Sequence, residues 1–295
     1  MKSFLKLTKF GIALFVMICG LAGYAVSFPL GHPLEFYQPL LLVVGLYLVS
    51  SGSFALNQAQ EWQHDKKMPR TAGRPVPAGV MKLWQAYVVG AVLTIFGVLA
   101  LLLIKPLVAG LALLTVVLYN GLYTLYWKKH WMFGAVPGAI PGAMPVVIGY
   151  AANSDNLIKP DLFYLFMILF LWQMPHFWSL AIRFREDYER GGFPVLPTKL
   201  GVERTLYHMG LYTFTYVGVA MAAPWFLNTH VMYVFLILPL AIKVLWEFFK
   251  YYKSKGEKNW LPFFLWVNLS MLVFICAPVF DKWLVYFLNV SNLSH

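Results

Sequence analysis

Three oxygen-bearing side chains recur every four residues near the end of an apolar stretch. Asn57, Glu61 and Asp65 occupy positions i, i+4 and i+8, and these positions lie on one face of an α-helix. Carboxylate and amide oxygens suit Mg²⁺, which usually also binds substrate phosphates. The spacing therefore indicates a magnesium–diphosphate site, although an ordinary amphipathic helix end at the membrane interface would show the same spacing.

Basic residues follow these carboxylates at once, in a loop of about residues 60–82 that contains several prolines and glycines. A diphosphate held through a metal needs cations beside the carboxylates. The basic residues expected to bind phosphate here are Lys66, Arg70 and Arg74.

A second long polar stretch, of about residues 183–205, contains matching side chains. Asp187 is its natural carboxylate centre, with Glu186 beside it. Long loops in a bundle whose other connections are short are usually functional. The basic residues of this stretch that could contact phosphate are Arg183, Arg185 and Lys199.

One histidine lies in the middle of an apolar segment. His176 follows Pro175 and has the aromatic neighbours Trp172, Phe177 and Trp178. Such a residue can be a hydrogen-bonded core histidine, a proton-transfer group or an axial ligand to a haem iron. The residues alone leave all three roles open.

The elements that must position these side chains are membrane helices. The chain has 295 residues, of which 60% are hydrophobic and 12% charged, whereas a soluble domain has about 25% charged residues. About 20 apolar residues span a bilayer as a helix. We expect an all-α bundle of nine transmembrane helices in one domain, residues 1–295, with helices at about 10–28, 39–59, 83–104, 107–127, 134–152, 161–183, 206–227, 230–249 and 260–280.

The distribution of charge predicts the orientation of this bundle. If the N-terminus is cytoplasmic, nearly all of the 23 Lys and Arg residues fall in cytoplasmic segments, and only Lys105, Lys159 and Lys282 fall on the other side. This is the positive-inside pattern. The net charge of +11 therefore reflects topology, and we expect no nucleic-acid partner.

The fifth apolar segment contains a regular series of prolines. Pro137, Pro141 and Pro145 recur every four residues and fall on one face, and several glycines lie between them. Glycines allow helices to approach closely, and prolines are tolerated where neighbours or cavity water compensate for the lost donors. The segment is either tightly packed or the kinked wall of a cavity.

Two stretches of the chain resemble the UbiA-type intramembrane prenyltransferases, and within them the branch that farnesylates haem. The superfamily motif N-x-x-x-D-x-x-x-D fits Asn57, Glu61 and Asp65, with Glu61 in place of the commoner Asp. The runs DKKMPRTAGRPVPAG and WQMPHFWSLAI look like the haem branch. Where the superfamily often has D-x-x-x-D, this chain has Arg183 to Asp187, so we expect the metal site to depend more on the first motif.

The resemblance covers residues 50–205 well and implies a reaction. It implies farnesyl diphosphate and haem B as substrates, Mg²⁺ as cofactor, and haem O and diphosphate as products. The apolar segments separately predict that the protein lies in a lipid bilayer, expected to be the bacterial plasma membrane, and the charge distribution predicts that its site faces the cytoplasm. A haem A synthase or a terminal oxidase assembly is an expected partner.

The same resemblance assigns roles to individual residues. Catalysis and metal binding would fall to Asn57, Glu61, Asp65 and Asp187. Charge on the leaving diphosphate would be stabilised by Lys66, Arg70, Lys128 and Arg185. The allylic cation would contact the aromatic faces of Tyr123, Trp172 and Phe177, and His176 would be a ligand of the haem iron.

Two rival functions stay open. The first is a UbiA-type prenyltransferase that acts on a quinone or another aromatic precursor. The second is a transporter of an anionic lipid-like solute, because transporters also use broken helices. The acidic residues lie at the membrane face rather than the midplane, which favours an enzyme, and the stretch WQMPHFW favours haem as the substrate.

Overall fold

The protein is helical throughout the part of the chain that the structure describes. The computed structural model describes the backbone of residues 2–293 and the side chains of residues 5–289, so Met1, Ser294 and His295 of the predicted domain lie outside it. Within these bounds there are helices and no strands. The predicted all-α class is confirmed.

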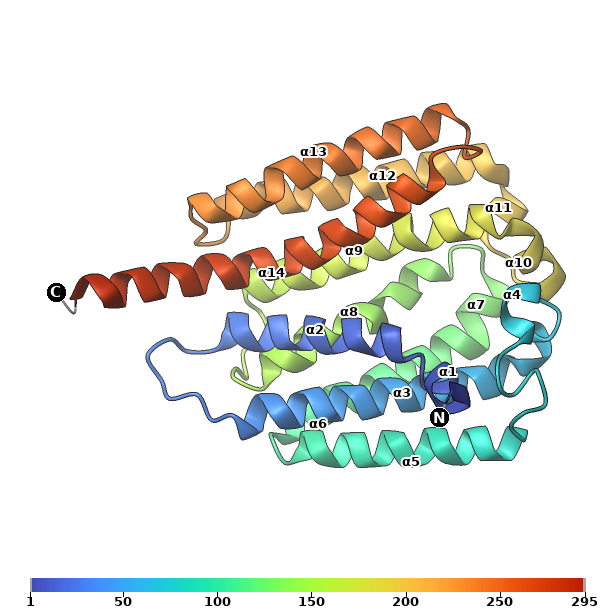
Figure 1. Ribbon diagram of the computed structural model, residues 1–295, viewed down its shortest axis with the longest axis horizontal. Helices are drawn as coiled ribbons and strands as arrows, with labels where there is room; N and C mark the ends of the chain where they lie inside the picture. The colour runs from blue at the N-terminus through green and yellow to red at the C-terminus, as the bar shows by residue number, and fades with distance from the viewer. Residues whose placement is uncertain (1, 294–295) are drawn as a thin grey trace.

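Long helices build the body of the molecule (Figure 1). They are α2 (Phe10–Ser27), α3 (Tyr37–Asp65), α5 (Leu83–Leu102), α6 (Pro106–Val116) with its continuations η1 (Val117–Trp127) and α7 (Lys128–His130), α8 (Ala135–Ala151), α9 (Pro160–Arg183), α12 (Gly201–Ala222), α13 (Val231–Lys253) and α14 (Trp260–Leu293). The short helices are α1 (Lys2–Thr8), α4 (Pro69–Ala72), α10 (Arg185–Gly191), α11 (Leu196–Lys199) and η2 (Ala223–Trp225).

Seven helical segments in the described part of the chain are long and apolar enough to cross a membrane. Two of the nine predicted spans are not among the seven. Helix α8 has 17 residues and is too short, and α12 carries Glu203, Arg204 and His208 in its first turns. The count of nine spans and the side on which the N-terminus lies stay predictions.

Small residues let the helices approach closely. A Cβ atom added to Gly149 of α8 would overlap the backbone of Gly20 in α2, and one added to Gly52 of α3 would overlap the backbone of Gly90 in α5. Two further glycines of α8 have side chains directly against them, Tyr123 at Gly138 and Gln173 at Gly142. Tight packing therefore accounts for the glycines of the proline-rich segment.

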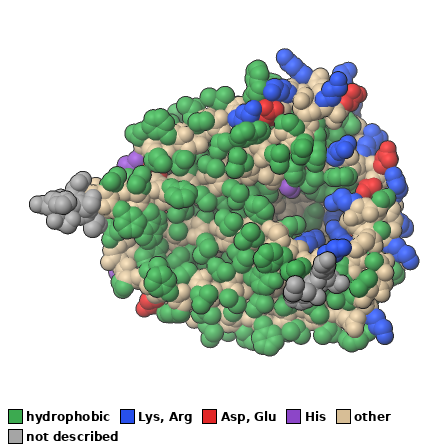
Figure 2. All heavy atoms as spheres, viewed as in Figure 1, with side chains coloured by type: hydrophobic (Ala, Val, Ile, Leu, Met, Phe, Trp, Pro, Cys, Tyr) green, Lys and Arg blue, Asp and Glu red, His purple; other side chains and the backbone are tan. Residues whose placement is uncertain are grey.

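The two polar loops lie at the same end of the bundle. The C-terminal end of α3 contacts α1 and lies at the same end of the molecule as α4, α10 and α11 (Figure 1), and we call this the polar end. Lys and Arg side chains gather over it, whereas hydrophobic side chains cover most of the rest of the visible face (Figure 2). Figure 2 also shows this face hollowed next to the polar end, with basic side chains at the rim of the hollow.

Candidate active site

The three polar residues at the end of α3 are almost completely buried. Asn57 is 2% exposed, and Glu61 and Asp65 are each 1% exposed. Their four-residue spacing turns them to the same side of α3, into the interior of the polar end. Burying two carboxylates is costly unless they are paired or bind a metal, so their partners decide what this face can do.

Each carboxylate has one cation as a partner. The Lys128 ammonium donates to Glu61 Oε2 at 2.7 Å, and the Arg74 guanidinium donates to Asp65 Oδ2 at 2.5 Å. Lys128 and Arg74 were both expected to bind phosphate. The structure places them beside the face of α3 that carries Asn57, Glu61 and Asp65. Tyr123 lies beside them, with its ring centroid 5.9 Å from the Lys128 ammonium.

The second oxygen of each carboxylate is not bonded to these cations. Glu61 Oε1 and Asp65 Oδ1 are buried and have no hydrogen-bond partner among the residues that the structure describes, and a buried acceptor without a partner in a native protein calls for an explanation. Asn57 donates its amide nitrogen to Thr124 Oγ1 at 3.2 Å, which leaves its carbonyl oxygen for another ligand. Two carboxylate oxygens and an amide oxygen are the donor set of a hard divalent cation, so these residues fit a magnesium ion.

A π-helix places the residues opposite α3. Segment η1 is π-helical over eleven residues, and such segments are rare and often found at functional sites. It buries Thr124 against Asn57, and it buries Asn120, whose amide donates to Ser53 O and to Gln60 Oε1 at 3.0 and 3.2 Å. Sequence reasoning missed Thr124 and Asn120, and their polarity within an apolar segment was the only available signal.

Lys9 is a further site residue that the sequence analysis treated only as a topological charge. The buried Gln58 side chain donates to the carbonyl oxygens of Lys6 and Leu7 at 3.0 and 2.8 Å, which fixes the end of α1. Lys9 follows there, partly buried, with its ammonium 5.1 Å from the Phe54 ring centroid. Burial, with the nearby positive charges of Arg74 and Lys128, lowers the pKa of the Lys9 amine to about 7.

The second polar loop covers this cation-lined face. The His64 ring nitrogen Nδ1 lies 2.8 Å from the carbonyl oxygen of Gly191. The Phe193 ring lies 4.9 Å from the His64 ring and 4.8 Å from the Lys128 ammonium. These contacts join the two loops that the sequence singled out, although they are more than a hundred residues apart.

The remaining predicted residues of the polar end form no ion pair with the α3 carboxylates in the described part of the chain. Asp187 is partly buried in α10 and forms no ion pair within the described residues. Arg185 is bonded to Glu189 of its own helix at 2.9 Å, and Arg70 packs over Phe184 with its guanidinium 5.1 Å from the ring centroid. Lys66, Arg183 and Lys199, which were also expected to bind phosphate, are exposed. The roles assigned to these residues stay predictions.

Trp172 and His176 form a separate group within α9. Their ring centroids are 4.7 Å apart, and the ring of Phe264, from α14, lies 5.0 Å from the His176 ring. The imidazole is therefore enclosed by aromatic faces from two helices, and it remains partly exposed.

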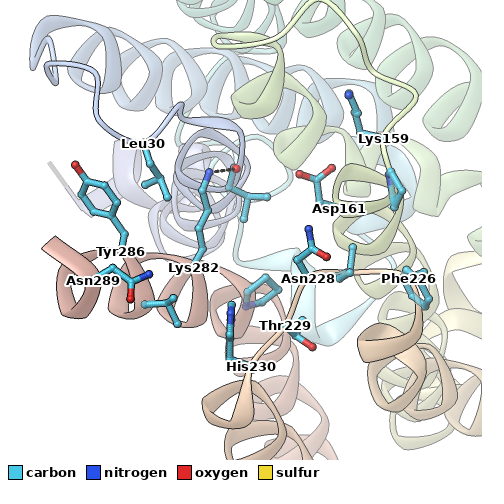
Figure 3. A pocket seen from close by; sticks show the side chains of 15 residues that line it. Leu30, Lys159, Asp161, Phe226, Asn228, Thr229, His230, Lys282, Tyr286 and Asn289 are labelled. Carbon is cyan, nitrogen blue, oxygen red and sulfur yellow. Dashed lines mark hydrogen bonds between the residues drawn. The ribbon is translucent and has the colours of Figure 1, made fainter. Parts of the chain in front are cut away.

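A cavity of about 570 Å³ lies at the other end of the bundle (Figure 3). Figure 3 shows Asp161, His230 and Lys282 around it, with Lys282 directed at the end of α2. The Lys282 ammonium donates to the carbonyl oxygens of Val26 and Phe28, each at 2.7 Å. From the sequence, Lys282 was only a charge on the non-cytoplasmic side, and Asp161 and His230 were not predicted as site residues. Asp161 accepts from Tyr150, and His230 is bonded to Asp281, so these side chains are already bonded to the protein.

Comparison with known proteins gives a consistent picture. Residues 16–269 match the model of the UbiA prenyltransferase family. A protoheme IX farnesyltransferase from Bdellovibrio bacteriovorus is 50% identical over 98% of this chain and 99% of its own length. Enzymes of the same name from Leptospira biflexa and Flavobacterium psychrophilum are 35% and 33% identical, over 82% and 92% of this chain and 86% and 93% of their own lengths.

Solved structures share the fold at low sequence identity. A digeranylgeranylglyceryl phosphate synthase superposes with a TM-score of 0.75 at 20% identity, covering 94% of this chain and 98% of that protein. A UbiA homologue from Archaeoglobus fulgidus, bound to DMAPP and Mg²⁺, superposes with a TM-score of 0.63 at 15% identity, covering 94% and 99%. Both likenesses support the arrangement of helices.

Proposed function

The chain belongs to the UbiA prenyltransferase family, and we propose that it transfers a farnesyl group from farnesyl diphosphate to a vinyl group of haem B. The products are haem O and diphosphate. The relative that is 50% identical over nearly the full length of both chains supports this choice of substrates. The resemblance seen in the sequence is thereby confirmed at the level of the family.

The observation that carries the proposal is the pair of buried carboxylates with unpaired oxygens at the end of α3. Glu61 and Asp65 each present one free oxygen beside Asn57. Lys128 and Arg74 place positive charge beside them, and the Lys9 amine lies nearby. A solved structure of the same fold contains both Mg²⁺ and an allylic diphosphate. We propose that Asn57, Glu61 and Asp65, with Asp187 from α10, hold Mg²⁺ here.

These residues act on the leaving group. Ionisation breaks the bond between the first carbon of the prenyl chain and the diphosphate oxygen, and negative charge accumulates on the diphosphate. Bound Mg²⁺ supplies a Lewis acid at that charge. The Lys128 and Arg74 side chains are already within 3 Å of the carboxylates, so they can stabilise the same charge without reorganising.

The rest of the reaction needs a dry cavity. The allylic cation must be shielded from water until the haem vinyl group attacks it, and the ring of Tyr123, beside Lys128, offers a cation–π contact. A carbon–carbon bond then forms, and water adds to the resulting cation as a hydroxyl group with release of a proton. The Phe193 ring above Lys128 helps to exclude water from the first step.

The membrane setting fits both substrates. The protein is an integral membrane protein with long apolar helices, and a farnesyl chain and a porphyrin both partition into lipid. We propose that the polar end, where the basic side chains gather, faces the cytoplasm of a bacterial inner membrane, because basic residues favour that side. Haem O made there could pass to a haem A synthase or a terminal oxidase.

Mass spectrometry of the products tests the proposal most directly. Purified protein with farnesyl diphosphate, haem B and Mg²⁺ should yield haem carrying a hydroxyethylfarnesyl group, together with diphosphate. Replacement of haem by an aromatic acid tests the quinone-precursor alternative. If no diphosphate is released with any acceptor, the protein is not a prenyltransferase.

A further inference from the structure

His176 has one neighbour that determines its chemistry. Its Nδ1 atom lies 2.8 Å from Oδ1 of Asn268, which belongs to α14. The Asn268 amide nitrogen in turn donates to the carbonyl oxygen of Phe264, one turn earlier in α14. The three residues therefore form a short hydrogen-bonded chain that runs from the α14 backbone to the imidazole.

This chain fixes the position of the imidazole proton. A backbone carbonyl can only accept a hydrogen bond, so the amide nitrogen of Asn268 must face Phe264 and its oxygen must face His176. An amide oxygen also only accepts, so Nδ1 of His176 must carry the proton. In the neutral ring, Nε2 is then the unprotonated nitrogen with a free lone pair.

The free nitrogen is available to a ligand. Nε2 of His176 has no hydrogen-bond partner among the described residues, and the residue is partly exposed. A neutral histidine that donates through one nitrogen and offers the other is the usual form of a metal-binding histidine, and the acceptor makes the ring a stronger ligand.

The surroundings of His176 fit a flat aromatic ligand with acidic arms. Trp172 and Phe264 flank the imidazole, and Trp260 stacks on Phe264 at 5.1 Å. The indole nitrogens of Trp172 and Trp260 are buried donors that have no partner within the described part of the chain. Arg183 is two turns after His176 on the same face of α9, about 10 Å along its axis, and its guanidinium lies 5.8 Å from the Trp260 ring centroid.

We infer that Asn268 is a positioning residue that prepares Nε2 of His176 to bind the iron of the haem substrate. This inference rests on the proposed function, because it takes haem as the acceptor, and it deepens that proposal by assigning the iron ligand and the residue that orients it. Asn268 does not touch the substrate. It acts by holding the proton on Nδ1 and by fixing the plane of the ring between α9 and α14.

The test compares two substitutions of Asn268 in the full-length purified protein. Asn268→Leu removes the acceptor with little change of size, whereas Asn268→Asp keeps an acceptor at the same place. The probe is ferric haem B, added without Mg²⁺ or prenyl diphosphate, and binding is followed by its absorption spectrum. Loss of an orienting partner typically weakens metal binding by roughly 10–100-fold, so Asn268→Leu should bind haem that much more weakly, and Asn268→Asp should bind it within a few-fold of the parent protein.

Two histidine variants accompany this comparison. His176→Ala should lose the histidine-ligated spectrum. His208→Ala is the matched control, because His208 is another partly exposed histidine that packs against an aromatic ring, that of Phe133, and it should leave haem binding unchanged.

Two results would overturn the inference. One is an Asn268→Leu protein that binds haem with the parent affinity and spectrum, and the other is a His176→Ala protein with an unchanged spectrum. If Asn268→Leu does not fold, the iron–nitrogen stretching frequency of ferrous haem in Asn268→Asp decides, because a carboxylate acceptor should raise that frequency and an equal frequency contradicts the inference. Haem binding through His176 without any farnesylated product would instead contradict the proposed function alone.

Discussion

The two ends of the bundle both bury carboxylates, but they treat the carboxylate oxygens differently. At the end opposite the polar end, Asp281 is 2% exposed. Its Oδ2 accepts from the backbone nitrogen and the ring of His230 at 2.8 and 2.9 Å, and its Oδ1 accepts from the backbone nitrogen of Tyr233 at 3.1 Å. At the polar end, Glu61 and Asp65 each have one bonded and one orphaned oxygen.

This difference separates a structural carboxylate from one that is available to a ligand. Both oxygens of Asp281 already have donors from the protein, so that side chain ties the start of α13 to α14. The orphaned oxygens of Glu61 and Asp65 cost stability in the free protein, and a bound cation would recover that cost. The hydrogen-bond partners of the buried carboxylates distinguish the two ends more clearly than the size of the cavity in Figure 3 does.

The largest expected effect is the loss of activity when a polar-end carboxylate is neutralised. Asp65→Asn and Glu61→Gln should each reduce Mg²⁺-dependent diphosphate release by about 10³-fold, because removal of one group that stabilises transition-state charge costs about 10²–10³-fold. Asp281→Asn, measured in the same assay, should keep most of the activity. Comparable losses in all three variants would erase the distinction between the two ends.

The next effect is on stability at the opposite end. Asp281→Ala removes the acceptor of the His230 backbone nitrogen and one of the two acceptors of the Tyr233 backbone nitrogen, which also donates to His230 O at 3.1 Å. An unsatisfied buried donor costs about 1–3 kcal/mol. We expect the free energy of unfolding in detergent to fall by this amount, as measured by denaturant titration. Asp65→Asn should change the free energy of unfolding less, because only one of the two Asp65 carboxylate oxygens has a hydrogen-bond partner to lose. A larger destabilisation in Asp65→Asn would argue for a structural role of the polar-end face.

A smaller effect is expected for Lys9. Lys9→Met should raise the KM for farnesyl diphosphate about tenfold with little change in kcat, because a hydrogen bond to a charged group contributes roughly 1.5 kcal/mol. Lys6→Met is the matched control, since the Lys6 side chain is exposed and only its backbone carbonyl is used. If both substitutions shift the KM equally, Lys9 acts through the overall positive charge of the polar end and not through the position of its amine.

The smallest effect concerns the orientation of Asn57. Thr124→Val keeps the shape of the side chain and removes the acceptor of the Asn57 amide, so turnover should fall about fivefold, the equivalent of roughly 1 kcal/mol. Thr115→Val controls for loss of a helix threonine, whose hydroxyl bonds to Leu111 O. Equal rates in Thr124→Val and the parent would show that Asn57 does not need this partner.

Local spacing allowed the sequence to predict part of this site. The four-residue repeat of Asn57, Glu61 and Asp65 depends only on helix geometry, and the structure buries all three on one side of α3. The Lys128–Glu61 pair joins residues 67 positions apart, and its geometry depends on a π-helix that no local pattern revealed. Lys9 was hidden for another reason, because a lysine before an apolar segment is normally a topological signal.

The hydrophobic pattern predicted the fold class for a similar reason. Apolar length is a property of a single segment, so the long helices were visible in the chain. Whether α8 and α12 cross the membrane depends on their neighbours, because α8 has 17 residues and α12 carries charges near its start. The hydrogen bond between His176 and Asn268 spans 92 residues and likewise could not be read from either segment.

The π-helical segment η1 sets the rotational phase of everything that follows it. Each residue of an α-helix advances the direction of the side chains by about 100°, so the wider turns of η1 shift the angle at which Lys128 leaves the helix. If these eleven residues formed α-helical turns at the same length, each would advance by about 100° and the Lys128 ammonium would point away from Glu61. The register of a single helix, rather than the chemistry of any one side chain, thus decides whether the α3 carboxylates meet their cation.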